Sequence, residues 1–249
     1  MTGQAKGKIA LVTGGNRGIG LETVRQIAQQ GMHVLLGARN EAKGKEAAEK
    51  LKGEKLDVEF ISLDVDDPKT HAQAAKTIEQ KFGKLDVLVN NAGILIDERN
   101  KGGFPVASQT SMATIRKTFE TNFFNVIALT QTLVPLIEKS DAGRIVFLSS
   151  GLASLTMHSD PKSPIYNYKP LAYDLSKTAL NAFAVHLAHE LRKTAIKFNV
   201  AHPGSVVTDM NAAGDLPVSE GAKTSVALAT LPADGYSGKF IHLGKELPW

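Results

Sequence analysis

The chain has 249 residues, of which 43% are hydrophobic and 22% charged, a composition typical of a globular protein large enough to bury a core. It contains no cysteine, which excludes disulfides, thiolate catalysis and cysteine-bound zinc. The formal net charge of +4 does not indicate a nucleic-acid partner, because lysines and acidic residues are interleaved over residues 40–55, as on a solvated helix face.

The segment that precedes the first apolar run, residues 1–7, has no hydrophobic region of the kind that signal peptides carry. Further along the chain, no apolar run reaches the roughly 18 residues that a membrane-spanning helix needs. We therefore expect a cytoplasmic protein with no membrane partner.

Apolar runs typical of buried strands alternate with segments of helical periodicity along the whole chain. This alternation predicts an α/β fold: one Rossmann-type, doubly wound domain over residues 1–249, with about seven parallel strands and helices on both faces of the sheet. The expected strands are residues 8–13, 33–38, 57–63, 85–90, 144–149, 197–202 and 239–243, and the expected helices are 18–30, 41–52, 68–82, 111–139, 171–194 and 219–230.

The turn after the first expected strand contains Gly14, Gly18 and Gly20. Glycine lets the backbone approach a ligand closely because no Cβ blocks the way. The helix that follows directs free N–H groups and its positive dipole end at this turn. At a first strand–helix junction this pattern predicts a dinucleotide pyrophosphate site, the alternative being a turn without a ligand.

Two irregular loops interrupt the alternation, at residues 94–109 and 151–170. Both follow strands, so both emerge at the carboxyl edge of the sheet, where ligands bind in open α/β folds. Long loops at this edge are usually functional.

Lys177 follows Tyr173 by one helical turn, so both side chains share one helix face. An ammonium about 4 Å from a phenolate stabilises it by roughly 4 kcal/mol. That would bring the pKa of Tyr173 from its ordinary value to near neutral pH, where general acid–base catalysis works best. The alternative is an exposed pair without contact, just as Ser149-Ser150 could be a simple turn.

Several motifs occur together in one order: the glycine turn of residues 13–20, Asn90-Asn91-Ala92-Gly93, Ser150, Tyr173-x-x-x-Lys177 and Pro203-Gly204. In this combination the chain resembles the short-chain dehydrogenase/reductase family from about Lys8 to its end. Within the family it is most similar to NADPH-dependent carbonyl reductases, through Asn16-Arg17 in the turn and Gly37-Ala38-Arg39-Asn40 after the second strand.

The resemblance implies a catalytic tetrad of Asn122, Ser150, Tyr173 and Lys177. Tyr173 would donate a proton to a carbonyl oxygen as hydride reaches the carbon, and would accept it in the reverse reaction. Ser150, chosen over Ser149 as the second residue after the strand, would hydrogen-bond the same oxygen. Lys177 would lower the pKa of Tyr173 and hold the nicotinamide ribose, and Asn122 would hold a water linking Lys177 to solvent.

The resemblance also implies that the cofactor lies along the carboxyl edge of the sheet. Ile19 would lie under the pyrophosphate, and Asp64 with Val65 would meet the adenine, unless Asp64 is a helix cap. Residues 91–93 would lie beside the adenosine ribose, and residues 203–208 would hold the carboxamide of the nicotinamide. The full set is Gly14, Asn16, Arg17, Gly18, Ile19, Gly20, Arg39, Asn40, Asp64, Val65, Asn91, Ala92, Gly93, Tyr173, Lys177, Pro203, Gly204, Val206 and Thr208.

The cofactor implied is NADP(H). Enzymes that prefer NADH commonly place an acid after the second strand, to bind the ribose 2′-hydroxyl. Here Arg39 and Asn40 follow that strand, and no carboxylate occurs before Glu41. Arg39 offers a planar fork to a 2′-phosphate, and Arg17 would reach it from the glycine turn. The alternative is that both arginines are merely solvated.

The segment between Ser150 and Tyr173 is about ten residues longer than in many family members. We expect this insertion to shape the substrate pocket, with His158, Tyr166 and Tyr168 at its border. Monomeric carbonyl reductases of the family carry a much longer insertion, so a homodimer or a homotetramer stays open for this chain.

Metal catalysis is not expected. Among the seven histidines, His186 and His189 lie on one helix face without an acidic partner at metal-ligand spacing.

The sequence thus predicts an NADPH-dependent carbonyl reductase that acts on a small carbonyl or alcohol substrate. One alternative is an alcohol dehydrogenase that works in the oxidative direction, because the same groups catalyse both directions. The other is a non-catalytic dinucleotide sensor, against which the complete tetrad argues.

Overall fold

The computed structural model describes residues 7–99 and 103–249. Their strands form one eight-stranded sheet in the order β3-β2-β1-β4-β5-β6-β7-β8. The first seven strands pair in parallel, as predicted, and the eighth pairs antiparallel with the seventh. The strands are β1 (Ile9–Thr13), β2 (His33–Ala38), β3 (Val58–Ser62), β4 (Val87–Asn90), β5 (Arg144–Leu148), β6 (Lys197–Ala201), β7 (Lys239–His242) and β8 (Lys245–Glu246).

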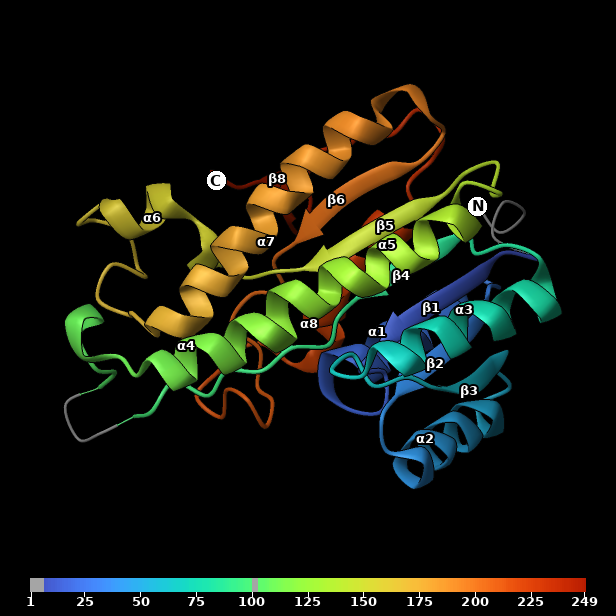
Figure 1. The fold of residues 1–249 in the computed structure, drawn as a ribbon, viewed down its shortest axis with the longest axis horizontal. Helices are drawn as coiled ribbons and strands as arrows, with labels where there is room; N and C mark the ends of the chain where they lie inside the picture. The colour runs from blue at the N-terminus through green and yellow to red at the C-terminus, as the bar shows by residue number, and fades with distance from the viewer. Residues whose placement is uncertain (1–6, 100–102) are drawn as a thin grey trace.

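The sheet is covered on both faces, as the apolar strands predict. One hydrophobic core lies between the sheet and α3 (Pro68–Phe82), α5 (Asn125–Ile137) and α7 (Leu171–Glu190), the helices in front of the sheet in Figure 1. A second core lies between the sheet and the helices α1 (Gly18–Gln29), α2 (Glu41–Gly53) and α8 (Val218–Ala229). All residues of β1 and β5 are buried, as expected for central parallel strands.

The helix predicted over residues 111–139 is present without a break over residues 112–137, but it contains a π-helical turn that was not predicted. The structure has α4 (Met112–Phe119), then a π-helical turn, η2 (Glu120–Phe124), and only then α5. The π turn brings Asn122 inside, where its side-chain amide bonds the backbone of Ile94. Single π turns often occur at functional sites. Hydrophobic periodicity does not reveal such a turn, because the apolar residues on either side still follow a helical pattern.

The two loops expected to be irregular contain short helices. The first includes η1 (Ala107–Gln109), and the second includes η3 (Gly151–Ala153) and α6 (Leu155–Ser159). In Figure 1 α6 and its loop project beyond the carboxyl ends of β5 and β6. A short helical turn, η4 (Leu191–Lys193), directly follows the end of α7.

The topology fixes where a ligand can bind. The chain runs outward from β1 to β3 on one side and then returns to β4 on the other side of β1. Ligands of doubly wound sheets bind at this switch point, at the carboxyl ends of the strands. The glycine turn follows β1 and the Asn91-Ala92-Gly93 segment follows β4, so both border it.

Among the helices of residues 7–99 and 103–249, none combines the length and the hydrophobicity that crossing a membrane requires.

Candidate active site

The glycine turn folds back tightly on itself. Gly14 and Gly18 have φ values of 64° and 54°, in the left-handed region that favours glycine. A Cβ on Gly20 would overlap the carbonyl oxygen of Gly14, so the third glycine is required by packing. Arg17 is the N-cap residue of α1, but its side chain makes no capping hydrogen bond, and the first turn of α1 contains no acidic residue. The N–H groups of this turn therefore suit an anionic ligand such as a pyrophosphate.

Asn91 supports this turn. Its Nδ2 donates to the carbonyl oxygens of Thr13 at 2.8 Å and Gly14 at 3.3 Å. The Thr13 Oγ1 in turn accepts from the backbone N–H groups of Asn91 and Ala92, each at 3.0 Å. The side chain of Asn91 thus binds the glycine turn. Only the backbone of the residues that follow it could then lie beside the ribose of a bound cofactor. Thr13 was not among the predicted site residues, although its place before the turn was a usable signal.

The residues after β2 and β3 also have defined partners. The Asn40 Oδ1 caps α2 by accepting from the backbone N–H of Lys43 at 2.9 Å. Asp64 accepts from the backbone N–H of Asp66 at 3.1 Å, whereas the cap of α3 is Asp67. The alternative that Asp64 is a helix cap is therefore wrong. Val65 lies next to it in the same half-buried turn.

The loop after β6 returns toward the glycine turn. Gly204 has a φ of 88°, which turns the chain after Pro203. Val206 is buried against Gly221. A Cβ on Gly18 would lie 3.8 Å from the methyl carbon of Thr208, so this loop and the glycine turn border the same space.

The two arginines expected at a 2′-phosphate differ in their surroundings. Arg17 forms an ion pair with Asp209, and the two side chains are 70% and 77% exposed. Arg39 is exposed at the end of β2. An ion pair this exposed contributes little stability, so an incoming anion can compete for Arg17. Asp209 was not anticipated, since nothing in its sequence position indicates a partner in the glycine turn.

Lys177 is buried, with 4% of its surface exposed. Its Nζ donates to the carbonyl oxygen of Leu148 at 2.8 Å and lies 5.7 Å from the centre of the Tyr173 ring. Burial lowers the pKa of Lys177 to about 8. The predicted sharing of one helix face is therefore confirmed for these two side chains.

The expected pKa of Tyr173 is wrong for this structure. Burial raises the pKa of Tyr173 above its ordinary value, and the neighbouring Ser150 side chain offsets only part of that effect. The amine of Lys177 does not offset it either, because it is directed at the Leu148 carbonyl and is itself desolvated. Tyr173 is consequently protonated at neutral pH, in the state of a proton donor.

The two serines after β5 have different roles. The Ser149 hydroxyl is buried and donates to Asn181 Oδ1 at 2.8 Å. The Ser150 hydroxyl accepts from the backbone N–H of Leu152 at 3.2 Å and is near enough to Tyr173 to lower the pKa of that side chain. Of the two, Ser150 is thus the one that can reach an oxygen bound beside Tyr173.

Asn122 is fully buried beneath these groups. Its Oδ1 accepts from the N–H of Ile94, and its Nδ2 donates to the Ile94 carbonyl oxygen, both at 2.8 Å, and to Ser176 Oγ at 3.1 Å. A Cβ on Gly93 would lie 3.2 Å from Asn122 Oδ1 and 3.5 Å from Lys177 Nζ, so the three residues are close neighbours. Because both amide hydrogens of Asn122 are used, its side chain could hold the predicted water only through Oδ1, and the water itself stays a prediction.

His158, one of the expected pocket residues, is held by other side chains. Its Nδ1 lies 2.8 Å from the amine of Lys169, and its Nε2 lies 2.9 Å from the Leu152 carbonyl oxygen and 3.2 Å from Asp174. Burial lowers its pKa. With both ring nitrogens occupied, His158 fixes the insertion to α7 and has little capacity left for a substrate.

The two tyrosines of the insertion are more accessible. Tyr166 is 37% exposed, with the amine of Lys169 over its ring at 5.2 Å from the centroid. Tyr168 packs edge-on against Phe104, with ring centres 5.1 Å apart. Their place at a substrate pocket stays a prediction.

Replacing Tyr166 or Tyr168 with alanine is expected to change the order of preference among bulky ketones, with little effect on KM for NADPH. The reason is that both rings belong to the insertion and neither belongs to the cofactor-binding turns. Competition assays with ketone mixtures would measure the order. An unchanged order in both variants would contradict a pocket role and leave the insertion as a surface or interface element.

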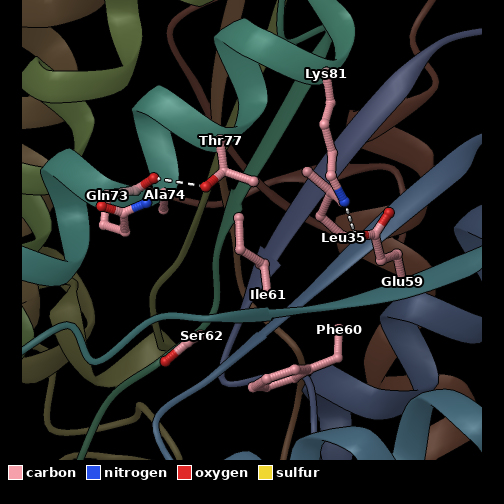
Figure 2. A pocket seen from close by; sticks show the side chains of 9 residues that line it. All are labelled: Leu35, Glu59, Phe60, Ile61, Ser62, Gln73, Ala74, Thr77 and Lys81. Atoms are coloured by element: carbon pink, nitrogen blue, oxygen red, sulfur yellow. Dashed lines mark hydrogen bonds and ion pairs between the residues drawn. The ribbon is translucent and has the colours of Figure 1, made fainter.

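Figure 2 shows a pocket elsewhere, between α3 and the edge strand β3. Ile61 points from β3 toward α3, Phe60 points to the opposite face of the sheet, and Lys81 pairs with Glu59 at the rim. None of its lining residues belongs to the predicted site. In the part of the chain that the structure describes, no three His, Asp or Glu side chains are grouped as a metal ion would need.

Comparison with known proteins identifies the family to which the chain belongs. Residues 8–216 match the family described as short chain dehydrogenase. The chain is 31% identical to carbonyl reductase [NADPH] 1 of Rattus norvegicus, covering 97% of this chain and 98% of that protein. The structure of salutaridine reductase from Papaver somniferum superposes with a TM-score of 0.79 at 31% identity, covering 94% of this chain and 99% of that chain. A short chain dehydrogenase of Shigella flexneri, solved in complex with NADP, gives a TM-score of 0.82 at 26% identity, covering 96% and 98%. The chain belongs to the short-chain dehydrogenase/reductase family of oxidoreductases.

Proposed function

We propose that this protein is an NADPH-dependent carbonyl reductase that converts ketones or aldehydes to alcohols. One observation carries the proposal: the Nζ of the buried Lys177 lies 5.7 Å from the centre of the Tyr173 ring, and Ser150 is a neighbour of the same tyrosine. These groups lie at the carboxyl edge of the sheet, where the glycine turn offers a site for a dinucleotide.

The catalytic work follows from the positions of the hydroxyls. A carbonyl oxygen bound between Ser150 and Tyr173 would accept a hydrogen bond from each, which stabilises the negative charge that develops there. Tyr173, protonated at neutral pH because burial raises its pKa, would then donate its proton to that oxygen. A bound nicotinamide dinucleotide supplies the hydride. Lys177 would hold the nicotinamide ribose, and its amine would return a proton to Tyr173.

The residues present fit such a cofactor. The turn of Gly14, Gly18 and Gly20 leaves no Cβ in the path of a pyrophosphate, and the first N–H groups of α1 have no side-chain cap. Arg39 at the end of β2 and Arg17 in the turn favour a 2′-phosphate over a bare ribose. Relatives whose names or structures include NADPH or NADP support the same preference.

The reductive direction is favoured over alcohol oxidation. Oxidation needs Tyr173 as a base, and a tyrosine whose pKa is raised is seldom ionised at neutral pH. Oxidation should therefore become efficient only as the pH rises toward the pKa of Tyr173. A non-catalytic dinucleotide sensor would not need Ser150, Tyr173 and Lys177 as neighbours.

The proposal is tested by measuring NADPH consumption with a panel of cyclic, aromatic and aliphatic ketones and aldehydes. Turnover of at least one class with NADPH is expected, with slower alcohol oxidation by NADP⁺ at pH 7. Tight NADPH binding without turnover of any member would favour the sensor. Faster oxidation than reduction at neutral pH would favour the alcohol dehydrogenase.

A further inference from the structure

The helix that carries Tyr173 and Lys177 has no cap of its own. Its N-cap residue, Pro170, offers no side-chain acceptor, although helix starts leave N–H groups unpaired. The acceptor comes from the loop after β4. Asp97 Oδ1 accepts from the N–H of Ala172 at 2.8 Å, and Asp97 Oδ2 accepts from the N–H of Tyr173 at 3.1 Å.

This carboxylate is buried, with 8% of its surface exposed, and a second carboxyl lies nearby. Burial and the negative charge of Asp97 together raise the pKa of Asp174 to about 8, and Asp174 Oδ1 has no partner among the described residues. Asp97 itself lies at the positive end of α7, where the helix dipole favours a carboxylate. An exposed serine or asparagine would cap a helix without burying a charge, so capping alone does not explain this arrangement.

The loop after β4 also contacts the rest of the site at two residues that precede Asp97. Asn91 holds the glycine turn, and Ile94 is held through both its N–H and its carbonyl oxygen by Asn122. Residues 91–97 thus connect the glycine turn, the π turn and the start of α7. A displacement at Asp97 would reach Tyr173 directly, because Tyr173 lies in the first turn of α7.

We propose that Asp97 is a positioning residue for the reaction, whose two hydrogen bonds hold the first turn of α7 so that the Tyr173 hydroxyl meets Ser150. The inference rests on the proposed function for its kinetic part only, since the placement of Tyr173 is measurable without turnover.

In the kinetic test, Asp97→Ala is expected to lower kcat by about 10- to 100-fold, because a displacement of about 1 Å can cost 10²-fold in rate. KM for NADPH should change less than about threefold, since no cofactor-binding turn is altered. Asp97→Asn keeps one acceptor and should fall between the wild type and the alanine variant. The matched control is Asp67→Ala, which removes the cap of α3, a helix without catalytic groups, and should lower the thermal midpoint without lowering kcat.

The second readout is the pH at which Tyr173 ionises, measured by tyrosinate absorbance. The signal of Tyr173 is obtained by subtracting the same titration of a protein that also carries Tyr173→Phe. In the wild type Tyr173 should ionise above the ordinary tyrosine pKa of about 10. In Asp97→Ala it should ionise closer to that value, because a loosened turn lets water reach the ring. Asp174, with a pKa of about 8, is ionised in both proteins over the pH range of this titration, so a change in its charge does not contribute to the shift.

The outcomes separate the two hypotheses. If Asp97→Ala leaves kcat and the Tyr173 titration unchanged and only lowers stability, as Asp67→Ala does, Asp97 is a helix cap and the proposal is overturned. If the wild type reduces no carbonyl compound but the titration shifts as expected, the positioning role stands and the proposed function fails.

Discussion

Tyr173→Phe is expected to lower kcat for ketone reduction by about 10²- to 10⁴-fold, the usual contribution of general acid catalysis. The phenylalanine keeps the ring at the start of α7 and removes only the hydroxyl, which is the proposed proton donor. NADPH binding should persist, because the glycine turn and the arginines are unchanged. Single-turnover kinetics together with NADPH fluorescence titration would measure both quantities.

The matched control is Tyr236→Phe, which removes a hydroxyl from a tyrosine that is 41% exposed and belongs to no predicted site. It should leave kcat unchanged. If Tyr173→Phe keeps more than about a tenth of the wild-type kcat, Tyr173 is not the proton donor, because so small a loss is below the range of acid catalysis.

The fold and the position of the site could be predicted because they depend on local patterns. Strand and helix periodicity were sufficient to predict seven strands, the main helices and a doubly wound sheet. The spacing of Tyr173 and Lys177 was sufficient to place them on one face of α7. The glycines at the end of β1 were sufficient to locate the turn at the switch point of the sheet.

What could not be predicted depends on contacts between distant parts of the chain. The π turn at Glu120–Phe124 exists where Asn122 meets Ile94, a contact across 28 positions. The bond of Asp97 to the start of α7 joins residues 76 positions apart at Tyr173. The pKa of Tyr173 was misjudged for a similar reason: spacing on a helix indicates a neighbouring amine, but the degree of burial and the direction of that amine depend on the surrounding strands.

Arg39→Ala is expected to raise KM for NADPH by about 10- to 150-fold, since a charge-assisted hydrogen bond contributes roughly 1.5–3 kcal/mol. KM for NADH should stay nearly the same, because NADH lacks the 2′-phosphate. The structure adds a ranking of the two arginines. Arg17 is already paired with Asp209, so binding a phosphate there must compete with that carboxylate, whereas Arg39 is exposed at the end of β2. Arg39→Ala should therefore have the larger effect of the two.

A suitable control is Lys45→Ala, which removes an exposed cation from α2, where it pairs with Glu41, without touching the end of β2. It should leave KM for both cofactors unchanged, and so exclude a general loss of positive charge as the cause. Asp209→Ala should lower KM for NADPH, because it frees Arg17 for the phosphate. If the wild type used NADH with equal or better kcat/KM than NADPH, the assignment of Arg17 and Arg39 to a 2′-phosphate would be wrong, since neither arginine would then discriminate between the cofactors.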